Sequence, residues 1–241
     1  MAFKYESAVP WGRSFDEYCR MFALSASDLE LRILGCADGP AGFNAEMSRQ
    51  GHRVVSCDPL YQFTAAQIQE RIDATYQEVI GQTRRNQERF VWNSIPSVDA
   101  LGQIRMAAMS NFLDDYAQGA LEGRYVTAEL PSLPFQAASF DLALCSHFLF
   151  LYSDNFSCEF HFQAIQAMCY VAHEARIFPL LTYNAEPSPH LEPLGAQLKV
   201  AGYDAVIETV PYEFQRGGNK MLRVKSENKN PKLVLSQVEG S

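Results

Sequence analysis

Residues 31–58 read LRILGCADGPAGFNAEMSRQGHRVVSCD, and this stretch decides the fold. It opens with a mostly apolar run over 31–36, which has the length of a β-strand. A turn of small residues follows over 35–42, and 43–50 has the pattern of a helix that ends before Gly51. A second apolar run over 53–57 leads to Asp58. We therefore predict a strand, turn, helix and strand that end in an acid.

The chemistry of such a unit is nucleotide binding. Small residues let a ligand approach the backbone, a helix N-terminus offers unpaired N–H groups, and a carboxylate accepts two ribose hydroxyls. The acid is expected about 20 residues past the turn, and Asp58 fits when the count starts at Gly39. A tight turn in another kind of α/β protein is the alternative.

The glycine spacing bears on which nucleotide is bound. A dinucleotide fingerprint has the form G-x-G-x-x-G. Here the glycines are Gly35, Gly39 and Gly42, and Ala37 stands where the second glycine would be. An NAD(P)-dependent oxidoreductase stays open as an alternative.

The turn instead resembles motif I of the class I S-adenosylmethionine-dependent methyltransferases, acid-x-Gly-x-Gly-x-Gly. Gly39 and Pro40 match a Gly-Pro pair often found there. Gly35 takes the place of the acid, and Asp38 is a nearby carboxylate that could replace it. Ala37 and Ala41 take two glycine places.

A second segment, 125–150, strengthens the resemblance. It has a strand pattern over 125–128, then Glu129, Leu-Pro-Phe at 133–135, and Phe-Asp at 140–141 before an apolar run. This order is frequent at the third and fourth strands of class I methyltransferases. The resemblance implies that Glu129 meets the adenine amino group and that the backbone of Leu130 meets the ring.

The resemblance also implies the fold class: α/β, with a doubly wound, mostly parallel seven-stranded sheet in the order 3-2-1-4-5-7-6. A hairpin predicted over 203–225, with Gly-Gly-Asn in its connection, suits the antiparallel end of that sheet. The domain is expected over 1–226, with a helical insertion over 62–121 that caps the strand ends, and 227–241 is expected to be a flexible tail.

S-adenosyl-L-methionine is the cofactor that the resemblance implies. The expected binding residues are Arg13, Gly35, Ala37, Gly39, Pro40, Asp58, Pro59, Leu60, Glu129, Leu130 and Ser146. Arg13 precedes a helix that Ser14 and Glu17 open as a capping box. In related methyltransferases this segment often covers the cofactor, so Arg13 could meet the methionine carboxylate; a solvated Arg13 beside the sheet edge is the alternative.

His147 is the candidate catalytic residue. It follows the predicted fourth strand, where a base would be needed if the acceptor must lose a proton. A single histidine among Phe148, Leu149 and Phe150 is also typical of a core residue. The histidines and cysteines show no zinc spacing, so no metal site is expected.

Composition limits the partners. The formal net charge is −8, and no basic stripe is visible, which argues against duplex nucleic acid and a membrane surface. Six cysteines without a C-x-x-C pair and no apolar leader indicate a cytoplasmic protein. The acceptor is a small molecule or a protein. Arg84, Arg85 and Arg89 could hold an acidic acceptor, or they form a solvated charge run.

Three functions remain open on the sequence. The first is a methyltransferase that uses S-adenosylmethionine on an unknown acceptor. The second is a module that binds S-adenosylmethionine without catalysis. The third is an NAD(P)-dependent oxidoreductase, which the Leu-Pro-Phe segment and the closing hairpin disfavour. The oligomeric state is not determined by any of these patterns.

Overall fold

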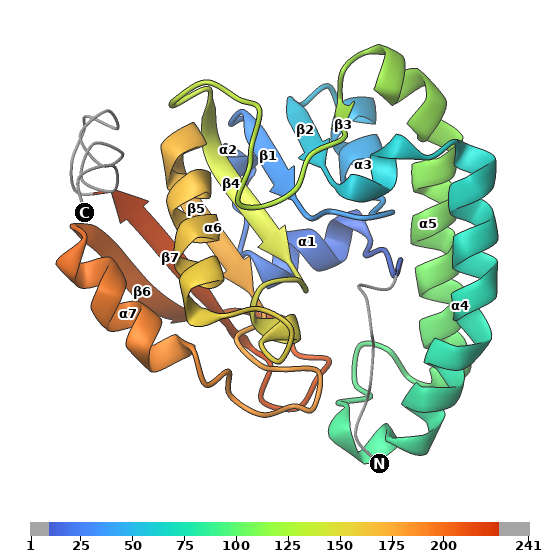
Figure 1. Cartoon of the computed structure of the whole chain (residues 1–241). Helices are drawn as coiled ribbons and strands as arrows, with labels where there is room; N and C mark the ends of the chain where they lie inside the picture. Colours follow the sequence, from blue (N-terminus) through green and yellow to red (C-terminus); the bar gives the residue numbers. More distant parts are fainter. Residues whose placement is uncertain (1–9, 227–241) are drawn as a thin grey trace.

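The computed structural model describes residues 10–226, which form a seven-stranded sheet with helices on both faces (Figure 1). The strands are β1 (Ile33–Cys36), β2 (Val54–Cys57), β3 (Tyr125–Val126), β4 (Phe140–Ser146), β5 (Ala172–Phe178), β6 (Tyr203–Thr209) and β7 (Lys220–Ser226). The helices are α1 (Phe15–Met21), α2 (Ala26–Leu29), α3 (Phe43–Arg49), α4 (Ala65–Arg85), α5 (Val98–Leu121), α6 (Cys158–Val171) and α7 (Leu191–Val200). The tail predicted at 227–241 lies outside the described residues.

The strand order is β3-β2-β1-β4-β5-β7-β6, so the predicted order and fold class are confirmed. Strands β1 to β5 are parallel, and β7 runs antiparallel to both β5 and β6. The chain winds one way from β1 to β3 and the other way from β4 onward. The carboxyl ends of β1 and β4 therefore form a switch point, where open α/β sheets bind their ligands.

Alternating side chains bury both faces of the sheet. In β1, Ile33 packs with the α1 and α3 side, whereas Leu34 and Cys36 pack with the α6 and α7 side. Strand β4 repeats the alternation, with Leu144 on the first face and Cys145 on the second. Parallel strands covered on both faces read as continuous apolar runs, which is why 31–36 and 140–145 were recognisable.

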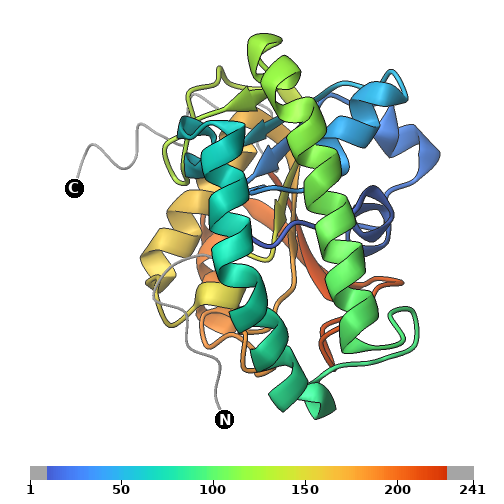
Figure 2. The same ribbon diagram turned by 90° about the vertical axis from the view of Figure 1, so that its right-hand side faces the viewer.

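Helices α4 and α5 occupy the segment predicted as a helical insertion. Thr64 opens α4 with the predicted capping box, and Ser97 caps α5. The two helices lie side by side beyond β3 and continue past the carboxyl ends of the strands (Figures 1 and 2). One half of α5 packs on β3 through Phe112 and Tyr116. Among residues 10–226, no helix is long and apolar enough to cross a bilayer.

Strand β5 begins earlier than the apolar pattern over 175–181 suggests. It covers Ala172–Phe178 and takes in charged residues that pair with one another. Glu174 accepts from Arg176 at 2.5 Å and pairs with Lys225 of β7 at 2.8 Å. These pairs satisfy polar groups that an apolar pattern leaves out. Pro179 ends the strand because it has no backbone N–H.

The predicted hairpin over 203–225 has a long connection. Strand β6 ends at Thr209, and a loop over 210–219 connects it to β7. Pro211 interrupts the ladder. The loop instead pairs with the segment after α4, where the N–H of Val91 donates to the carbonyl of Phe214 at 2.7 Å. This contact joins the connection between α4 and α5, in the middle of the insertion, to the antiparallel end of the sheet.

Candidate functional site

The turn after β1 approaches the open end of the sheet in a tight conformation. Ala37 has φ of +52° and Gly39 has φ of +54°. Only glycine adopts this left-handed region without a steric cost, so Ala37 occupies a motif glycine place at some strain. The predicted helix N-terminus follows as α3, whose N-cap Gly42 makes no side-chain cap.

Asp38 explains why a glycine stands in the place of the motif acid. A Cβ added to Gly35 would lie 2.2 Å from Oδ2 of Asp38. Asp38 is buried there and accepts hydrogen bonds from Tyr18 at 2.5 Å and Ser56 at 2.6 Å. Burial raises its pKa, against the effect of these two donors. Asp38 therefore fills the space beside β1 that a larger residue at 35 would need.

Asp58 ends β2 and is held before any ligand binds. Its Oδ2 accepts from the N–H of Gly39 at 2.9 Å, and its Oδ1 accepts from the N–H of Leu60 at 2.7 Å. A carboxylate has about four acceptor positions, so two are left for ligand hydroxyls. Burial raises the pKa of Asp58 to about 6, although the two backbone donors act in the opposite direction.

A cavity of about 580 Å³ opens at the switch point, within the usual range for ligand pockets. Most of the predicted cofactor residues line it, and they come from four strand ends and the N-terminal segment. They are Arg13, Ala37, Gly39, Pro40, Asp58, Pro59, Leu60, Glu129, Leu130 and Ser146. Gly35 is not among the lining residues, because it lies within β1 below the turn.

His147 lies in the wall rather than in the apolar core. Its Nδ1 is 2.9 Å from Oγ of Ser146, and its backbone N–H donates to Phe178 at 2.6 Å. It has φ of +53°, a conformation that turns the chain away from β4. Burial, and then the charges of Arg13 and Arg105, lower its pKa well below 6.5. The imidazole is therefore neutral at pH 7, which is the form a base needs, while the same surroundings weaken its basicity.

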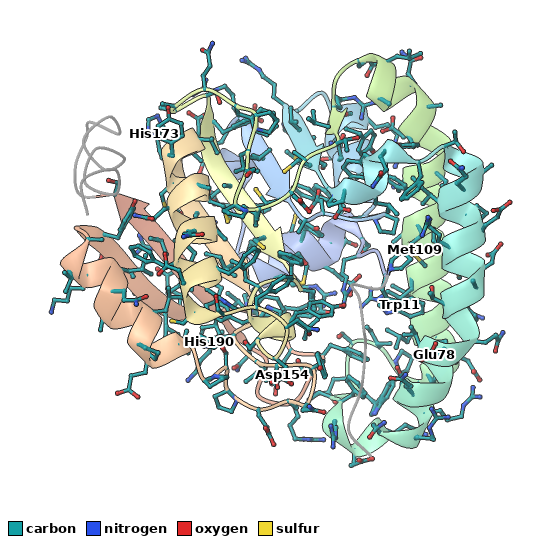
Figure 3. All side chains as sticks on the ribbon, in the orientation of Figure 1. Trp11, Glu78, Met109, Asp154, His173 and His190 are labelled. Carbon is teal, nitrogen blue, oxygen red and sulfur yellow. The ribbon has the colours of Figure 1, made fainter. Side chains whose placement is uncertain are left out.

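A second cavity of about 130 Å³ adjoins the first, and both are lined by Trp11, Arg13, His147 and Tyr152. Its other walls come from α4, α5, the residues after β5 and the loop over 210–219. Trp11 faces the long helices (Figure 3), where its ring centroid lies 6.0 Å from that of Tyr76.

Arg105 of α5 lines the second cavity and is 1% exposed. Its Nη1 donates to Glu17 of α1, whose other oxygen accepts from the hydroxyl of Tyr212 at 2.8 Å. Burial opposes the ionisation of Glu17, but the charge and hydrogen bond of Arg105 lower its pKa to about 2. Glu17 thus both closes the capping box of α1 and pairs with a cation on α5.

Arg13 is half-buried and lies where the two cavities meet. Its Nη1 donates to the carbonyl of Trp11. Burial, and then the like charge of Arg105, lower its pKa to about 10. Within the described part of the chain, Nε of Arg13 and Nε of Arg105 have no hydrogen-bond partner.

The predicted cluster of Arg84, Arg85 and Arg89 lines neither cavity. Arg84 and Arg85 are exposed, and Arg84 pairs with Asp99 at 2.8 Å. Arg89 donates to Asn184 at 3.2 Å. The solvated charge run is the better description of the first two residues.

The second cavity was not predicted from the sequence, although a charged residue in the buried stripe of α5 was a signal for it. The buried stripe of α5 runs through Leu101, Arg105, Ala108 and Phe112. A charged residue in register with a buried stripe needs a buried partner. That partner, Glu17, lies 88 positions earlier in the sequence, and no local pattern connects the two.

Comparisons with known proteins place the chain in a family. No protein-family model matches it. The uncharacterized protein MJ0045 of Methanocaldococcus jannaschii is 32% identical over 224 residues, which cover 91% of this chain and 97% of the relative. The chain belongs to the family of this archaeal protein.

Solved structures resemble the fold at low sequence identity. Magnesium protoporphyrin IX methyltransferase from Synechocystis, with bound SAM, has a TM-score of 0.47 at 11% identity and covers 88% of this chain and 78% of its own. A possible histamine N-methyltransferase from Thermotoga maritima has a TM-score of 0.43 at 11% identity over 89% of each chain. The strand order of this chain is itself that of a class I methyltransferase-like fold.

Proposed function

We propose that this protein is an S-adenosylmethionine-dependent methyltransferase. The observation that carries the proposal is the wall of the larger cavity, where the turn after β1 and Asp58 after β2 meet Glu129 and Ser146. The cavity is large enough for a nucleoside with an amino acid attached. Asp58 has acceptor positions left for two hydroxyls, which is the need of a ribose.

Most of the predicted residues that line the cavity then have a role. Asp58 accepts the ribose hydroxyls, and Leu60 and Leu130 contact the two sides of the adenine. Glu129 accepts from the adenine amino group. The backbone from Ala37 to Pro40 supports the methionine moiety, and Arg13 binds its carboxylate.

The bound cofactor supplies a methyl group that its sulfonium already activates. The chain therefore needs to align the acceptor and to exclude water. Where the acceptor is a hydroxyl or an amine, neutral His147 takes its proton as the bond to the methyl carbon forms and the carbon–sulfur bond breaks, leaving S-adenosylhomocysteine. Ser146 orients the imidazole through the 2.9 Å contact with Nδ1.

Two other functions are weighed against this one. Asp58 would serve an NAD(P) ribose as well, but the closing antiparallel β7 is not expected of a plain dinucleotide-binding domain. A module that binds S-adenosylmethionine without catalysis would need the larger cavity alone. The second cavity, which adjoins it at His147, favours an enzyme with an acceptor.

Methyl transfer from labelled S-adenosylmethionine tests the proposal. The protein is incubated with a panel of one-ring phenols, amines and thiols, and label in the acceptor is counted. We expect transfer by the wild type and at least about a hundredfold less by His147→Asn with a hydroxyl or amine acceptor. If the wild type binds S-adenosylhomocysteine but transfers label no faster than Asp58→Ala to any acceptor in the panel, the protein is a binding module instead.

A further inference from the structure

The second cavity has walls of unusual composition. Its lining holds two guanidinium groups and no carboxylate among the described residues, and the rest is mostly aromatic and aliphatic. Trp11, Phe90, Tyr212 and Phe214 provide ring faces. Such a surface suits a flat apolar body that carries a negative charge.

Two guanidinium groups line the second cavity, and one nearby carboxylate faces them. Arg13 and Arg105 are both desolvated, and the carboxylate that faces them, Glu17, stands behind Arg105 rather than in the wall. Glu17 is also shared, because it accepts from the N–H of Ser14 at 3.0 Å and from Tyr212. With Arg13 assigned to the methionine carboxylate of the cofactor, Arg105 is the cation on the acceptor side, and the carboxylate that pairs with it is shared with other donors.

The hydrogen-bond donors are not used up either. A guanidinium has five N–H donors, and Nη1 of Arg105 donates to Glu17. Its Nε is buried without a partner, as is Nε of Arg13. A carboxylate is the anion whose planar geometry matches a guanidinium.

The size of the cavity limits the body of the ligand. A cavity of about 150 Å³ has room for one benzene ring, and this cavity has about 130 Å³. It meets the larger cavity at His147 and Tyr152. A ring inside it would therefore present one edge to the larger cavity and the other edge to Arg105.

We propose that the second cavity binds the methyl acceptor, and that this acceptor is a one-ring aromatic carboxylate whose charged group is held by Arg105. This inference rests on the proposed function, in which the larger cavity holds the cofactor. Arg13 lines both cavities and is assigned to the cofactor, whereas Arg105 lines only the second cavity. Arg105 is then a residue that determines specificity.

Calorimetry with 4-hydroxybenzoate and its neutral isostere 4-hydroxybenzamide tests the inference on the full chain saturated with S-adenosylhomocysteine. We expect the carboxylate to bind roughly tenfold or more tightly than the amide, because a charge-assisted hydrogen bond separates them. Equal affinities, tighter binding of the amide, or no binding of either compound would overturn the proposal.

Two variants test whether Arg105 is the group that binds the carboxylate of the ligand. Glu17→Gln keeps the capping box, since glutamine serves at that position, but removes the competing carboxylate. It should bind 4-hydroxybenzoate more tightly than the wild type. Glu17→Gln combined with Arg105→Gln leaves no unpaired charge and should lose the preference for the carboxylate. A preference that survives in the double variant would contradict the role of Arg105.

S-adenosylhomocysteine affinity separates this inference from the proposed function. We expect it to stay within about threefold of wild type in both variants, because Glu17 and Arg105 line no part of the larger cavity. If the wild type binds S-adenosylhomocysteine but prefers the neutral ring, the acceptor class alone is wrong. If the wild type does not bind S-adenosylhomocysteine, the proposed function is wrong.

Discussion

Asp58 is positioned by the backbone before a ligand is present. The N–H groups of Gly39 and Leu60 each hold one carboxylate oxygen. The carboxylate therefore needs little reorganisation on binding, which limits the entropic cost. Its surroundings nevertheless disfavour the charged form, and that conflict has a measurable consequence.

The affinity for S-adenosylhomocysteine should fall as the pH drops below about 6, the value to which burial raises the pKa of Asp58. Ribose hydroxyls donate to the ionised carboxylate, so binding lowers this pKa, and protonation must oppose binding. Between the free and bound pKa values the dissociation constant should rise up to tenfold per pH unit. Asp58→Asn should lack this dependence in a calorimetric titration; an identical pH profile in both proteins would contradict the assignment.

The side chain of Asp38 lies close to Gly35. Because a Cβ at position 35 would lie 2.2 Å from the carboxylate of Asp38, Gly35→Ala should lower the free energy of unfolding by ~1–3 kcal/mol. Gly195→Ala in α7 is the control, since nothing lies within 4 Å of its added Cβ. Denaturant titration should find the control neutral or stabilised by ~0.5–1 kcal/mol. Equal stability of the two variants would show that Asp38 moves aside freely.

At the scale of elements, the two halves of α5 have different contacts. One part packs against β3 through an aromatic cluster that includes Phe112 and Tyr116. The other part extends past the strand ends and brings Leu101 and Arg105 to the second cavity. The ion pair between Arg105 and Glu17 connects this part of α5 with α1.

This buried pair should be strongly non-additive in stability. Arg105→Gln leaves the carboxylate of Glu17 buried without its cation and should cost ~3–5 kcal/mol. Adding Glu17→Gln removes that unpaired charge, so the double variant should recover part of the loss. Urea denaturation of the four proteins in the cycle gives the coupling. Additive losses would mean that the two side chains do not interact in solution.

The insertion over 62–121 should respond to the cofactor as a cap. Helices α4 and α5 wall the second cavity, and the turn before α4 contributes Gln62 and Phe63 to the larger one. We expect S-adenosylhomocysteine to slow hydrogen exchange at the start of α4 as well as over 31–60 and 125–150. Helix α7, which lines neither cavity, is the internal control. Slowing confined to 31–60 and 125–150 would argue against a cap that the cofactor closes.

At the scale of the whole molecule, local patterns predicted the sheet well. The runs at 31–36 and 53–57 are buried on both faces, so their composition alone marks them as parallel strands. Gly51, with φ of +83°, ends α3 as a C-terminal glycine should. The strand order came from the resemblance, and the structure confirms it.

Contacts distant in sequence account for what could not be predicted. The charged residues of β5 are tolerated because Lys225 of β7 and Asp28 before β1 pair with them. The loop over 210–219 leaves the hairpin because its backbone pairs with Val91. The second cavity is assembled from segments that lie far apart in the sequence, so no single local pattern predicts it.

The central claim is that the larger cavity binds S-adenosylmethionine, and thermal unfolding with candidate cofactors tests it most directly. The protein is heated with S-adenosylmethionine, S-adenosylhomocysteine, NAD or NADP at equal concentrations, because a ligand that binds the folded state raises the midpoint, and a tighter ligand raises it more. We expect S-adenosylmethionine and S-adenosylhomocysteine to raise the midpoint of unfolding and NAD and NADP to leave it unchanged. Folded Asp58→Ala should bind S-adenosylhomocysteine ~1–3 kcal/mol more weakly than the wild type. A rise with NAD or NADP alone, or a full response from Asp58→Ala, would contradict the claim.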